Sequence, residues 1–497
     1  MLFNSYEFLF LFLPVTVTGF FFVARHGRTA ATLWLVLASF IFYGWWDVRY
    51  VPLLCASIGW NYAIGRRIER LAAGHAIQPG GHVARNVPGA AARKGWLALG
   101  IIVNVALLGY FKYLDFFLGT ANALAGEDVF DLPHIVLPLG ISFYTFTQTA
   151  YLIDAYRGQA KNVSLLTYCE FVTIFPHLIA GPIINHREMI PQFVAARTFR
   201  VDWENVARGL TLFAIGLAKK VLIADKLAPW VNDVFARADA LTLLEAWIGA
   251  LGYTMQLYFD FSGYSEMAIG LGLLLNLRLP LNFDAPYRSL SVIDFWRRWH
   301  RTLGLWVKNY LYIPMGGGRC GPAKKMRNLF ASMLIIGFWH GAGWTFVFWG
   351  GLHGVLLMIN HLWRRTRIEL PKLVCWLLTF AGVVVCWVFF RAASFHDAWS
   401  LLVAMTDVQG LALSGKYVGL LAHVGITGVD IGTPTASPGH LALILGALAL
   451  CLLVPHPVRL LETRFAPGWT WCLASAALLF FTVMHLQGHT EFLYFQF

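Results

Sequence analysis

Long apolar segments, separated by short polar loops, recur along the whole chain. They lie near residues 8–24, 31–47, 50–65, 96–117, 135–153, 164–184, 206–224, 243–276, 329–361, 372–390, 441–455 and 469–487. A helix needs about 20 apolar residues to cross the hydrocarbon core of a bilayer. Helices satisfy their backbone hydrogen bonds internally, as lipid requires. The pattern therefore predicts an all-α, polytopic membrane protein.

Two of these segments, 243–276 and 329–361, are too long for one ordinary span. Each contains glycine or polar residues, so we expect each to form two spans or a broken helix. Irregular backbone at membrane depth is tolerated only where protein or a cavity satisfies its polar groups. These two segments are therefore the places where we look for buried chemistry.

Composition agrees with a membrane protein, since the chain is 58% hydrophobic and only 13% charged. The net charge of +12 does not indicate nucleic-acid binding, because the basic residues gather in short loops. The most basic loops are 65–95, 284–327 and 362–372, which the positive-inside rule assigns to the cytoplasm. A basic cytoplasmic mouth also attracts an anionic, phosphate-bearing cofactor.

The remaining loops complete the predicted topology. Segment 118–134 has acidic residues and no Lys or Arg, so we place it on the outer side, together with the loop 408–440. The N-terminus comes out on that side as well, and so does the C-terminus if the last two apolar segments each cross once. We see no soluble segment large enough to fold alone, and the chain is therefore expected to form a single membrane domain over residues 1–497.

His340 lies in one of the most apolar stretches, residues 334–353. An ionisable group at bilayer depth costs roughly 2.5 kcal/mol or more unless it is paired or lines a wet cavity. A neutral imidazole can take a proton from a hydroxyl near pH 7, which suits a general base. Trp339 and Trp344 flank it and could wall a chamber. The alternative is a structural histidine that is hydrogen-bonded between helices.

His300 is the second candidate and lies in a basic, aromatic stretch with Arg297, Arg298, Trp299 and Arg301. The neighbouring guanidinium groups disfavour a protonated imidazole. A neutral His300 could orient a substrate or donate to a developing oxyanion. An interfacial histidine on an amphipathic cytoplasmic helix explains the residue equally well.

Other polar residues lie within the apolar segments. His353 would be nearly opposite His340 on one continuous helix, so we expect a packing or supporting role. Asp260 and Glu266 are intramembrane carboxylates, which usually pair or line a pathway, and they could hold an arginine or a histidine in place. The chain has no HExxH motif, no GxSxG motif and no Cys/His spacing typical of a metal site.

Six segments together resemble the membrane-bound O-acyltransferase (MBOAT) family, in particular its bacterial branch of alginate O-acetylation proteins. They are Leu178–Ile183, Asp260–Gly270, Phe295–Leu303, Tyr310–Gly317, Phe338–Trp344 and Phe492–Phe497. They follow one another in the family's order over nearly the whole chain. The run Ile184–His186 departs from the alginate pattern and leaves the acceptor polymer open.

The resemblance implies a fold of about 11–13 transmembrane or re-entrant helices around a central tunnel, with an MBOAT-like core over residues 135–365. It implies that His340 matches the family's essential histidine and that His300 matches the second polar position. An acetyl donor, acetyl-CoA, would bind from the cytoplasm as a substrate, and no permanently bound cofactor or metal is expected. The donor- or substrate-binding candidates are Arg297, Arg298, Arg301, Trp299, Trp339, Trp344, Asp260 and His353.

The resulting hypothesis is an O-acetyltransferase component of the bacterial inner membrane that serves O-acetylation of an exopolysaccharide of alginate or cellulose type. Its expected partners are the lipid bilayer, a periplasmic SGNH/esterase-like acetyltransferase and the polysaccharide synthesis machinery. Two alternatives remain open at this point. One is a transporter or flippase that uses the histidines as a proton relay, and the other is a scaffold that only docks a periplasmic acetylase.

Overall fold

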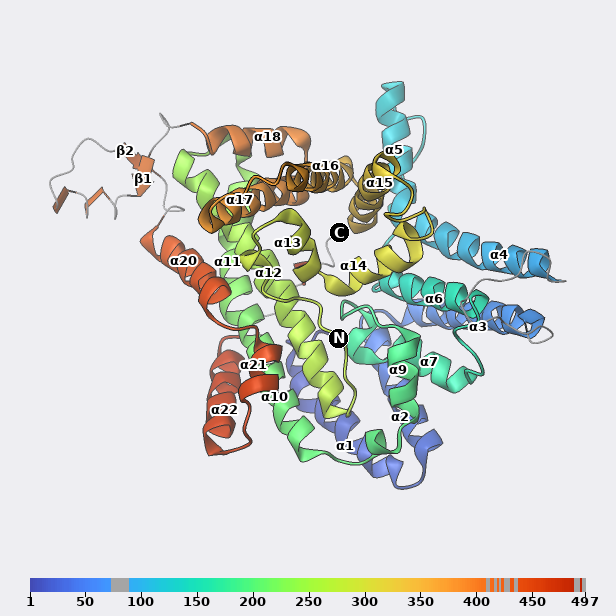
Figure 1. Cartoon of the computed structure of the whole chain (residues 1–497). Coiled ribbons are helices and arrows are strands. Elements are labelled where there is room, and N and C mark those ends of the chain that lie inside the picture. Colours follow the sequence, from blue (N-terminus) through green and yellow to red (C-terminus); the bar gives the residue numbers. More distant parts are fainter. Residues whose placement is uncertain are drawn as a thin grey trace. The chain divides into compact units, whose positions relative to one another are not determined.

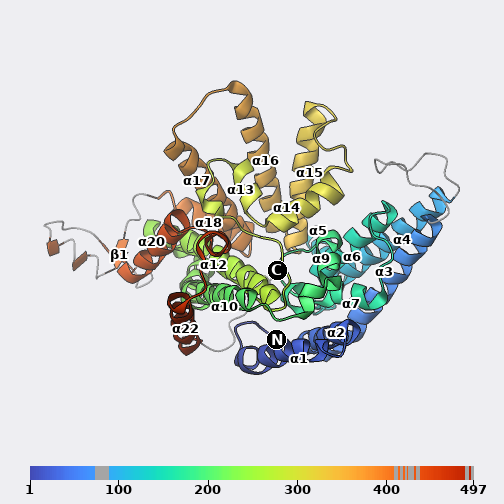
Figure 2. The same ribbon diagram turned by 60° about the horizontal axis from the view of Figure 1, so that its bottom comes forward.

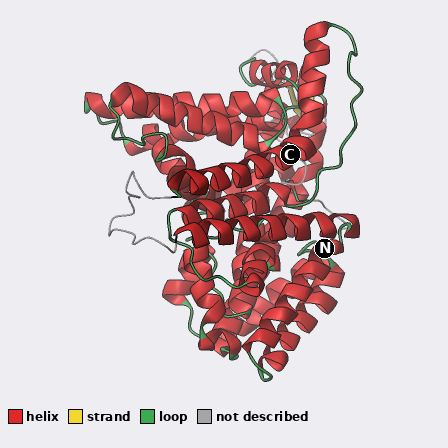
Figure 3. Cartoon of the chain, turned by 90° about the vertical axis from the view of Figure 1, so that its right-hand side faces the viewer, coloured by secondary structure: helices red, strands yellow, loops and turns green. Residues whose placement is uncertain are grey.

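The computed structural model describes residues 1–72, 89–407, 412–414, 418–419, 422–423, 430–432, 437–486 and 492–493. Regular structure in these residues is almost entirely helical (Figure 3). The exceptions are two short strands, β1 (Ala412–Ser414) and β2 (Asp430–Gly432), which pair in parallel. The predicted all-α membrane fold is confirmed. Parts of the basic loop 65–95, most of the loop 408–440, and residues 494–497 of the last motif lie outside the described residues.

The chain divides into two compact units. Unit 1 comprises Met1–Phe213, Met267–Leu281 and Pro467–Cys472, and unit 2 comprises Ala214–Glu266, Asn282–Ala466 and Leu473–Phe497. The single-domain organisation stays a prediction.

Unit 1 is built from helices whose buried polar side chains form hydrogen bonds between helices. Its elements are η1 (Phe8–Phe12), α1 (Leu13–Ala24), α2 (Arg28–Gly44), η2 (Val48–Tyr50), α3 (Val51–Ala72), α4 (Ala90–Leu108), η3 (Gly109–Tyr113), α5 (Leu114–Ala125), α6 (Ile141–Tyr156), α7 (Leu165–Thr173), α8 (Phe175–Leu178), α9 (His186–Val194), η4 (Ala196–Phe199) and most of α10 (Trp203–Ala218). The side-chain amides of Asn61 and Asn104 bond each other between α3 and α4, at 3.0 and 2.7 Å. Gln148 of α6 donates to Ser57 Oγ at 2.9 Å. Polar residues in these apolar segments therefore serve interhelical hydrogen bonding.

Unit 2 contains the elements that carry the candidate site (Figure 1). They are η5 (Lys219–Ala224), α11 (Asp225–Ala236), η6 (Ala238–Ala240), α12 (Leu243–Leu274, as far as Glu266), η7 (Pro286–Arg288), α13 (Val292–Arg298), α14 (Arg301–Val307), η8 (Lys308–Tyr312), α15 (Pro322–His340), α16 (Trp344–Thr366), α17 (Lys372–Arg391), α18 (Phe395–Ala404), β1, β2, α20 (Pro438–Leu453), α21 (Pro457–Arg464) and most of α22 (Trp469–Met484).

Segment 243–276 forms one continuous helix, α12, so the prediction of a break there is wrong. The glycines that suggested a break serve close packing instead. A Cβ atom on Gly263 would lie 2.7 Å from the carbonyl oxygen of Gly216. Glycine costs a helix about 1 kcal/mol relative to alanine, which tertiary contacts of this kind outweigh.

Segment 329–361 does break, as predicted. Helix α15 ends at His340 and α16 begins at Trp344, because Gly341 and Gly343 adopt extended backbone with φ of −153° and −166°. The two helices then pack side by side, and α17 packs against α16 (Figure 2). The break places His340 at a helix end within the interior of the unit.

Length and hydropathy identify three helical segments in the described residues that could each cross a bilayer: Ala90–Ala125, Trp344–Thr366 and Lys372–Arg391. A fourth is added if Pro438–Leu453 and Pro457–Arg464, which are bent by 44°, form one span. Shorter apolar helices cover Phe8–Ala24, Arg28–Gly44 and Trp469–Met484. The total number of spans, the topology and the central tunnel stay predictions.

Candidate active site

His300 occupies a strained turn between α13 and α14. Its backbone has φ of 42° and ψ of 52°, which lies in the left-handed region that residues other than glycine rarely adopt. Such a conformation costs about 1–3 kcal/mol and persists where its surroundings enforce it. Here the N–H of Arg301 donates to the carbonyl of Asn282 at 2.8 Å, and the N–H of Asp284 donates to the carbonyl of Arg298 at 3.0 Å. The neighbouring segment 282–284 therefore holds the turn in place.

The side chain of His300 is fully buried and belongs to a polar network. Its Nδ1 lies 3.0 Å from Oδ1 of Asn282. The hydroxyl of Thr302 donates to the same oxygen at 2.9 Å, and Nδ2 of Asn282 donates to Oγ of Ser265 at 3.1 Å. A buried network with this many partners holds an imidazole in one orientation.

The structure brings His300 and His340 together. Their ring centroids lie 6.4 Å apart, a separation that one small polar group can bridge. Aromatic rings surround His340: the centroids of Trp339, Trp349 and Phe390 lie 4.9, 5.1 and 5.4 Å from its own. Trp339 therefore lies in the wall around the histidine pair.

His353 lies on the far side of Trp349, whose ring centroid is 5.0 Å from that of His353 and 5.1 Å from that of His340. The indole N–H of Trp296 donates to Nδ1 of His353 at 3.2 Å. In the neutral ring the proton is therefore on Nε2. His353 is fully buried, and its packing or supporting role stays a prediction.

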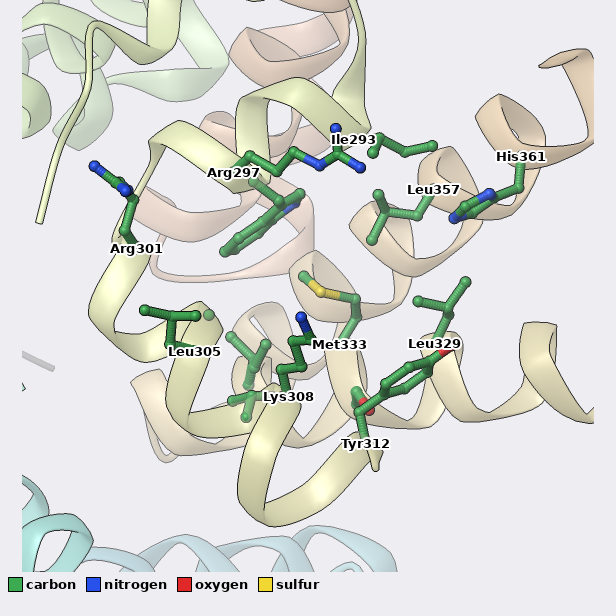
Figure 4. A pocket seen from close by; sticks show the side chains of 15 residues that line it. Ile293, Arg297, Arg301, Leu305, Lys308, Tyr312, Leu329, Met333, Leu357 and His361 are labelled. Carbon is green, nitrogen blue, oxygen red and sulfur yellow. The ribbon is translucent and has the colours of Figure 1, made fainter. Parts of the chain in front are cut away.

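The three arginines do not share one environment. Arg298 pairs with Asp294 at 3.0 Å and donates to the carbonyl of Asp284 at 3.3 Å, so it stabilises the turn. Arg297 and Arg301 instead line a cavity of about 540 Å³ (Figure 4). The other lining residues are Ile293, Trp296, Gly304, Leu305, Val307, Lys308, Tyr312, Leu329, Ser332, Met333, Ile336, Leu357 and His361. The cavity combines cationic and apolar side chains.

The other two predicted tryptophans lie in different places. Trp299 is buried in an aromatic cluster, with ring centroids 4.9 Å from Trp387 and 5.6 Å from Phe295. Trp344 begins α16, is 54% exposed, and lines an apolar groove that also includes Phe348. Trp299 therefore serves packing, and Trp344 lies on the surface instead of in a closed chamber wall.

Asp260 forms a separate ionic cluster. The prediction that it pairs with an arginine or a histidine is wrong, because its partner is a lysine. Its carboxylate lies 2.6 Å from Nζ of Lys220, which is also 2.8 Å from Asp225. It also accepts the N–H of Leu493 at 3.0 Å. Lys220 reaches Asp260 because η5 packs close to α12, where a Cβ atom on Gly263 would lie 3.3 Å from the backbone nitrogen of Lys220.

Glu266 follows the expectation in part, since its carboxylate lies 3.3 Å from His456 and 2.7 Å from Lys219. The sequence held a signal for both lysines. Lys219 and Lys220 lie inside an apolar segment, and buried cations need acidic partners. Asn282 and Trp296, by contrast, gave no signal, because only the fold shows that they bond histidines.

Within the described part of the chain, no three His, Cys, Asp or Glu side chains gather where they could hold a metal ion. The site itself offers two imidazoles in an aromatic enclosure, near a cavity with a cationic lining. The two imidazoles can take up and return a proton. The cationic cavity beside them can attract a ligand that carries negative charge.

Comparison with known proteins defines the class. The profile of the MBOAT, membrane-bound O-acyltransferase family, matches residues 97–396, which include both histidines and the cavity. The chain belongs to this family, and it is an acyltransferase with apolar helices of a multi-pass membrane protein.

Several relatives carry specific names. "Peptidoglycan O-acetyltransferase" of Helicobacter pylori is 43% identical over 83% of this chain and 81% of its own length. "Probable alginate O-acetylase AlgI" of Azotobacter vinelandii is 40% identical over 100% of both chains. "Teichoic acid D-alanyltransferase" of Bacillus subtilis is 26% identical over 53% of this chain and 71% of its own length. These names share the transfer of an acyl group, which is the activity that this chain has.

Proposed function

We propose that this protein is the inner-membrane O-acetyltransferase component that takes acetyl groups from acetyl-CoA in the cytoplasm and passes them across the membrane to an exopolysaccharide of alginate or cellulose type. The observation that carries the proposal is the buried pair of His300 and His340, with ring centroids 6.4 Å apart. The names of two relatives, which describe O-acetyl transfer to alginate and to peptidoglycan, support acetate as the acyl group.

The cavity lined by Arg297 and Arg301 supplies a site for the donor. Lys308 projects into it together with apolar side chains such as Met333 and Leu357 (Figure 4). Guanidinium and ammonium groups bind phosphates through charge-assisted hydrogen bonds. The apolar wall suits the thioester arm. A cavity with these two halves supports a donor that joins a phosphorylated nucleotide to an acyl thioester.

The transfer itself needs a base and a place for the acceptor. An acceptor hydroxyl that lies between the two imidazole rings gives up its proton to one of them, and its oxygen attacks the thioester carbonyl carbon. The carbon–sulfur bond then breaks, and the thiolate takes the proton. In this step the aromatic rings around His340 exclude water that would otherwise hydrolyse the donor.

A periplasmic SGNH/esterase-like partner and the polysaccharide synthesis machinery complete the proposed route. The predicted topology supports this order, because the basic loop 284–327, which supplies the cationic residues Arg297, Arg301 and Lys308 of the donor cavity, is assigned to the cytoplasm and the polymer lies outside. The acetyl group must then leave the histidine pair on the outer side.

Polymer-linked acetate in cells tests the proposal. Cells that lack the endogenous protein receive the wild-type chain, His340→Ala, or His396→Ala, whose histidine is an exposed side chain of α18. Wild type and His396→Ala should restore acetate on the polymer, and His340→Ala should not. Normal acetylation by a correctly inserted His340→Ala chain would contradict the proposal. Proton-coupled flux without acetyl transfer would indicate a transporter, and a purified chain that neither binds nor uses labelled acetyl-CoA would indicate a scaffold.

A further inference from the structure

Phe492 and Leu493 belong to the last of the six segments that relate the chain to its family, and the proposed function gives them no part. Both side chains are buried in unit 2. We propose that Phe492 is a positioning residue, which holds the imidazole of His300 in place through the ring of Phe261. This role rests on the proposed acetyl transfer and adds to it, because a segment far along the chain then supports one member of the histidine pair.

A buried ionic cluster fixes the backbone of this segment. The N–H of Leu493 donates to Oδ2 of Asp260 at 3.0 Å, and the other oxygen of that carboxylate lies 2.6 Å from Nζ of Lys220. The same Nζ lies 2.8 Å from Asp225, so one ammonium group serves two carboxylates. Buried ions are stable only when hydrogen bonds satisfy their remaining atoms. The backbone N–H meets this need at Asp260 and ties the segment to α12.

Aromatic contacts connect this anchor with the histidine. Phe261 follows Asp260 directly in α12, and Tyr264 lies about one turn further on. The ring of Phe492 contacts both, with centroids 4.7 Å from Tyr264 and 5.8 Å from Phe261. Phe261 in turn meets the imidazole of His300 edge-on, with centroids 4.8 Å apart and planes at 87°. One helix therefore carries both the anchor and the ring that touches the imidazole.

The position of Phe261 depends on the rings around it. Its centroid lies 4.9 Å from that of Phe283, which is on the histidine side, and Phe492 contacts it as well. All of these rings, and His300, are at most 1% exposed. A protein interior is close-packed, so a ring moves only when a neighbour leaves space for it. Removal of the Phe492 ring gives Phe261 room to turn away from the imidazole.

A displaced imidazole should slow the reaction without weakening the donor. Proton transfer needs aligned atoms, and a misplacement of about 1 Å can cost about 100-fold in rate. Neither Phe261 nor Phe492 is among the residues that line the donor cavity. The expected signature is therefore a lower kcat with little change in KM for acetyl-CoA.

Substitutions of Phe492 test this signature. The purified full chain in lipid nanodiscs receives acetyl-CoA, the periplasmic SGNH/esterase-like partner and a soluble oligosaccharide acceptor. Phe492→Ala should lower kcat about tenfold or more and leave KM for acetyl-CoA within about twofold of wild type. Phe492→Leu fills most of the space again and should recover most of kcat. An unchanged kcat in Phe492→Ala would overturn the inference.

The imidazole of His300 also reports its own surroundings. The chain is labelled with ¹³C-histidine, and the ring C–H signals of His300 are assigned by their loss in His300→Gln. Aromatic rings shift the resonances of nearby nuclei, so a displaced Phe261 should move these signals in Phe492→Ala. His300 signals at their wild-type positions would overturn the inference even where kcat has fallen, because the imidazole would not have lost its ring contact.

A matched pair of variants at Leu493 tests the anchor. Leu493→Pro removes the N–H that Asp260 accepts, whereas Leu493→Met keeps it at a similar side-chain volume. The proline variant should reproduce the lower kcat and the moved His300 signals of Phe492→Ala, and the methionine variant should behave like wild type. Equal behaviour of the two variants would refute the anchoring role of Asp260.

Phe235→Ala is the control for the loss of a buried phenyl group. Phe235 lies in α11 of unit 2, is also buried, and contacts Tyr253 with centroids 5.8 Å apart. This variant should unfold at a lower temperature but keep the wild-type kcat per folded chain and the wild-type His300 signals. An equal fall in its kcat would overturn the positioning role of Phe492. A wild-type chain that transfers no acetyl group would refute the proposed function, and the His300 signals would still decide whether Phe492 holds the imidazole.

Discussion

The indole N–H of Trp296 donates to Nδ1 of His353 at 3.2 Å, and this bond links α13 to α16 beside the histidine pair. Trp296 also lines the donor cavity. One side chain therefore connects the cavity with the buried aromatic cluster. The structure makes several such contacts testable one by one.

Replacing Trp296 by Phe retains an aromatic ring but removes the donor. Nδ1 of His353 would remain buried without a partner, which costs about 1–3 kcal/mol. We expect a lower unfolding temperature in detergent than for the wild-type chain. Trp399→Phe, at an exposed position of α18, is the control and should unfold like wild type. An unchanged unfolding temperature for Trp296→Phe would show that the bond contributes nothing.

The pair of Lys220 and Asp260 should matter for stability. Removing one partner of a buried ion pair costs about 3–5 kcal/mol, because the other charge stays buried. Asp260→Leu should therefore destabilise the chain, although Asp225 still pairs with Lys220. The loss in the double variant Asp260→Leu/Lys220→Met should be smaller than the sum of the two single losses. The free energy of unfolding, measured by denaturant titration in detergent, gives the comparison. Additive losses in the double variant would contradict direct coupling.

Gly337 allows α15 and α16 to pack closely. A Cβ atom there would lie 2.9 Å from Cα of Gly350 and would clash with the carbonyl oxygen of Phe346. Gly337→Ala should force the helices apart and displace His340, so acetyl transfer should fall well below wild type in a chain that still inserts. Gly446→Ala, where a Cβ meets open space, should retain activity. Full activity of Gly337→Ala would mean that the helices adjust without moving the histidine.

The basic residues of the cavity should strengthen the binding of acetyl-CoA. Arg301→Gln removes a charge-assisted contact worth about 1.5–3 kcal/mol, so KM for acetyl-CoA should rise roughly tenfold or more. The effect should shrink at high salt. Acetyl-N-acetylcysteamine, a thioester without phosphates, should show no difference between Arg301→Gln and wild type. Arg364→Gln, in the basic segment 362–372, is the control, and an equal KM effect there would indicate general electrostatic attraction only.

The sequence predicted the helical membrane fold because apolar length reports directly on membrane spanning. It also singled out His300 and His340, since ionisable groups in apolar surroundings are costly. The sequence does not distinguish a glycine that interrupts a helix, such as Gly341, from one that allows two helices to pack closely, such as Gly263. It therefore predicted a break in α12 that the structure does not have. The contact between Asn282 and His300 depends on the fold alone, which brings the segment after α12 against the turn between α13 and α14.

The most direct test uses the purified chain in proteoliposomes with [¹⁴C]acetyl-CoA outside, and with the periplasmic SGNH/esterase-like partner and a soluble oligosaccharide acceptor inside. The account predicts that label appears on the oligosaccharide with wild type and His396→Ala, and falls to background with His300→Ala and His340→Ala. Label transfer at the wild-type rate by a folded His300→Ala chain would contradict the claim that the buried histidine pair carries the reaction.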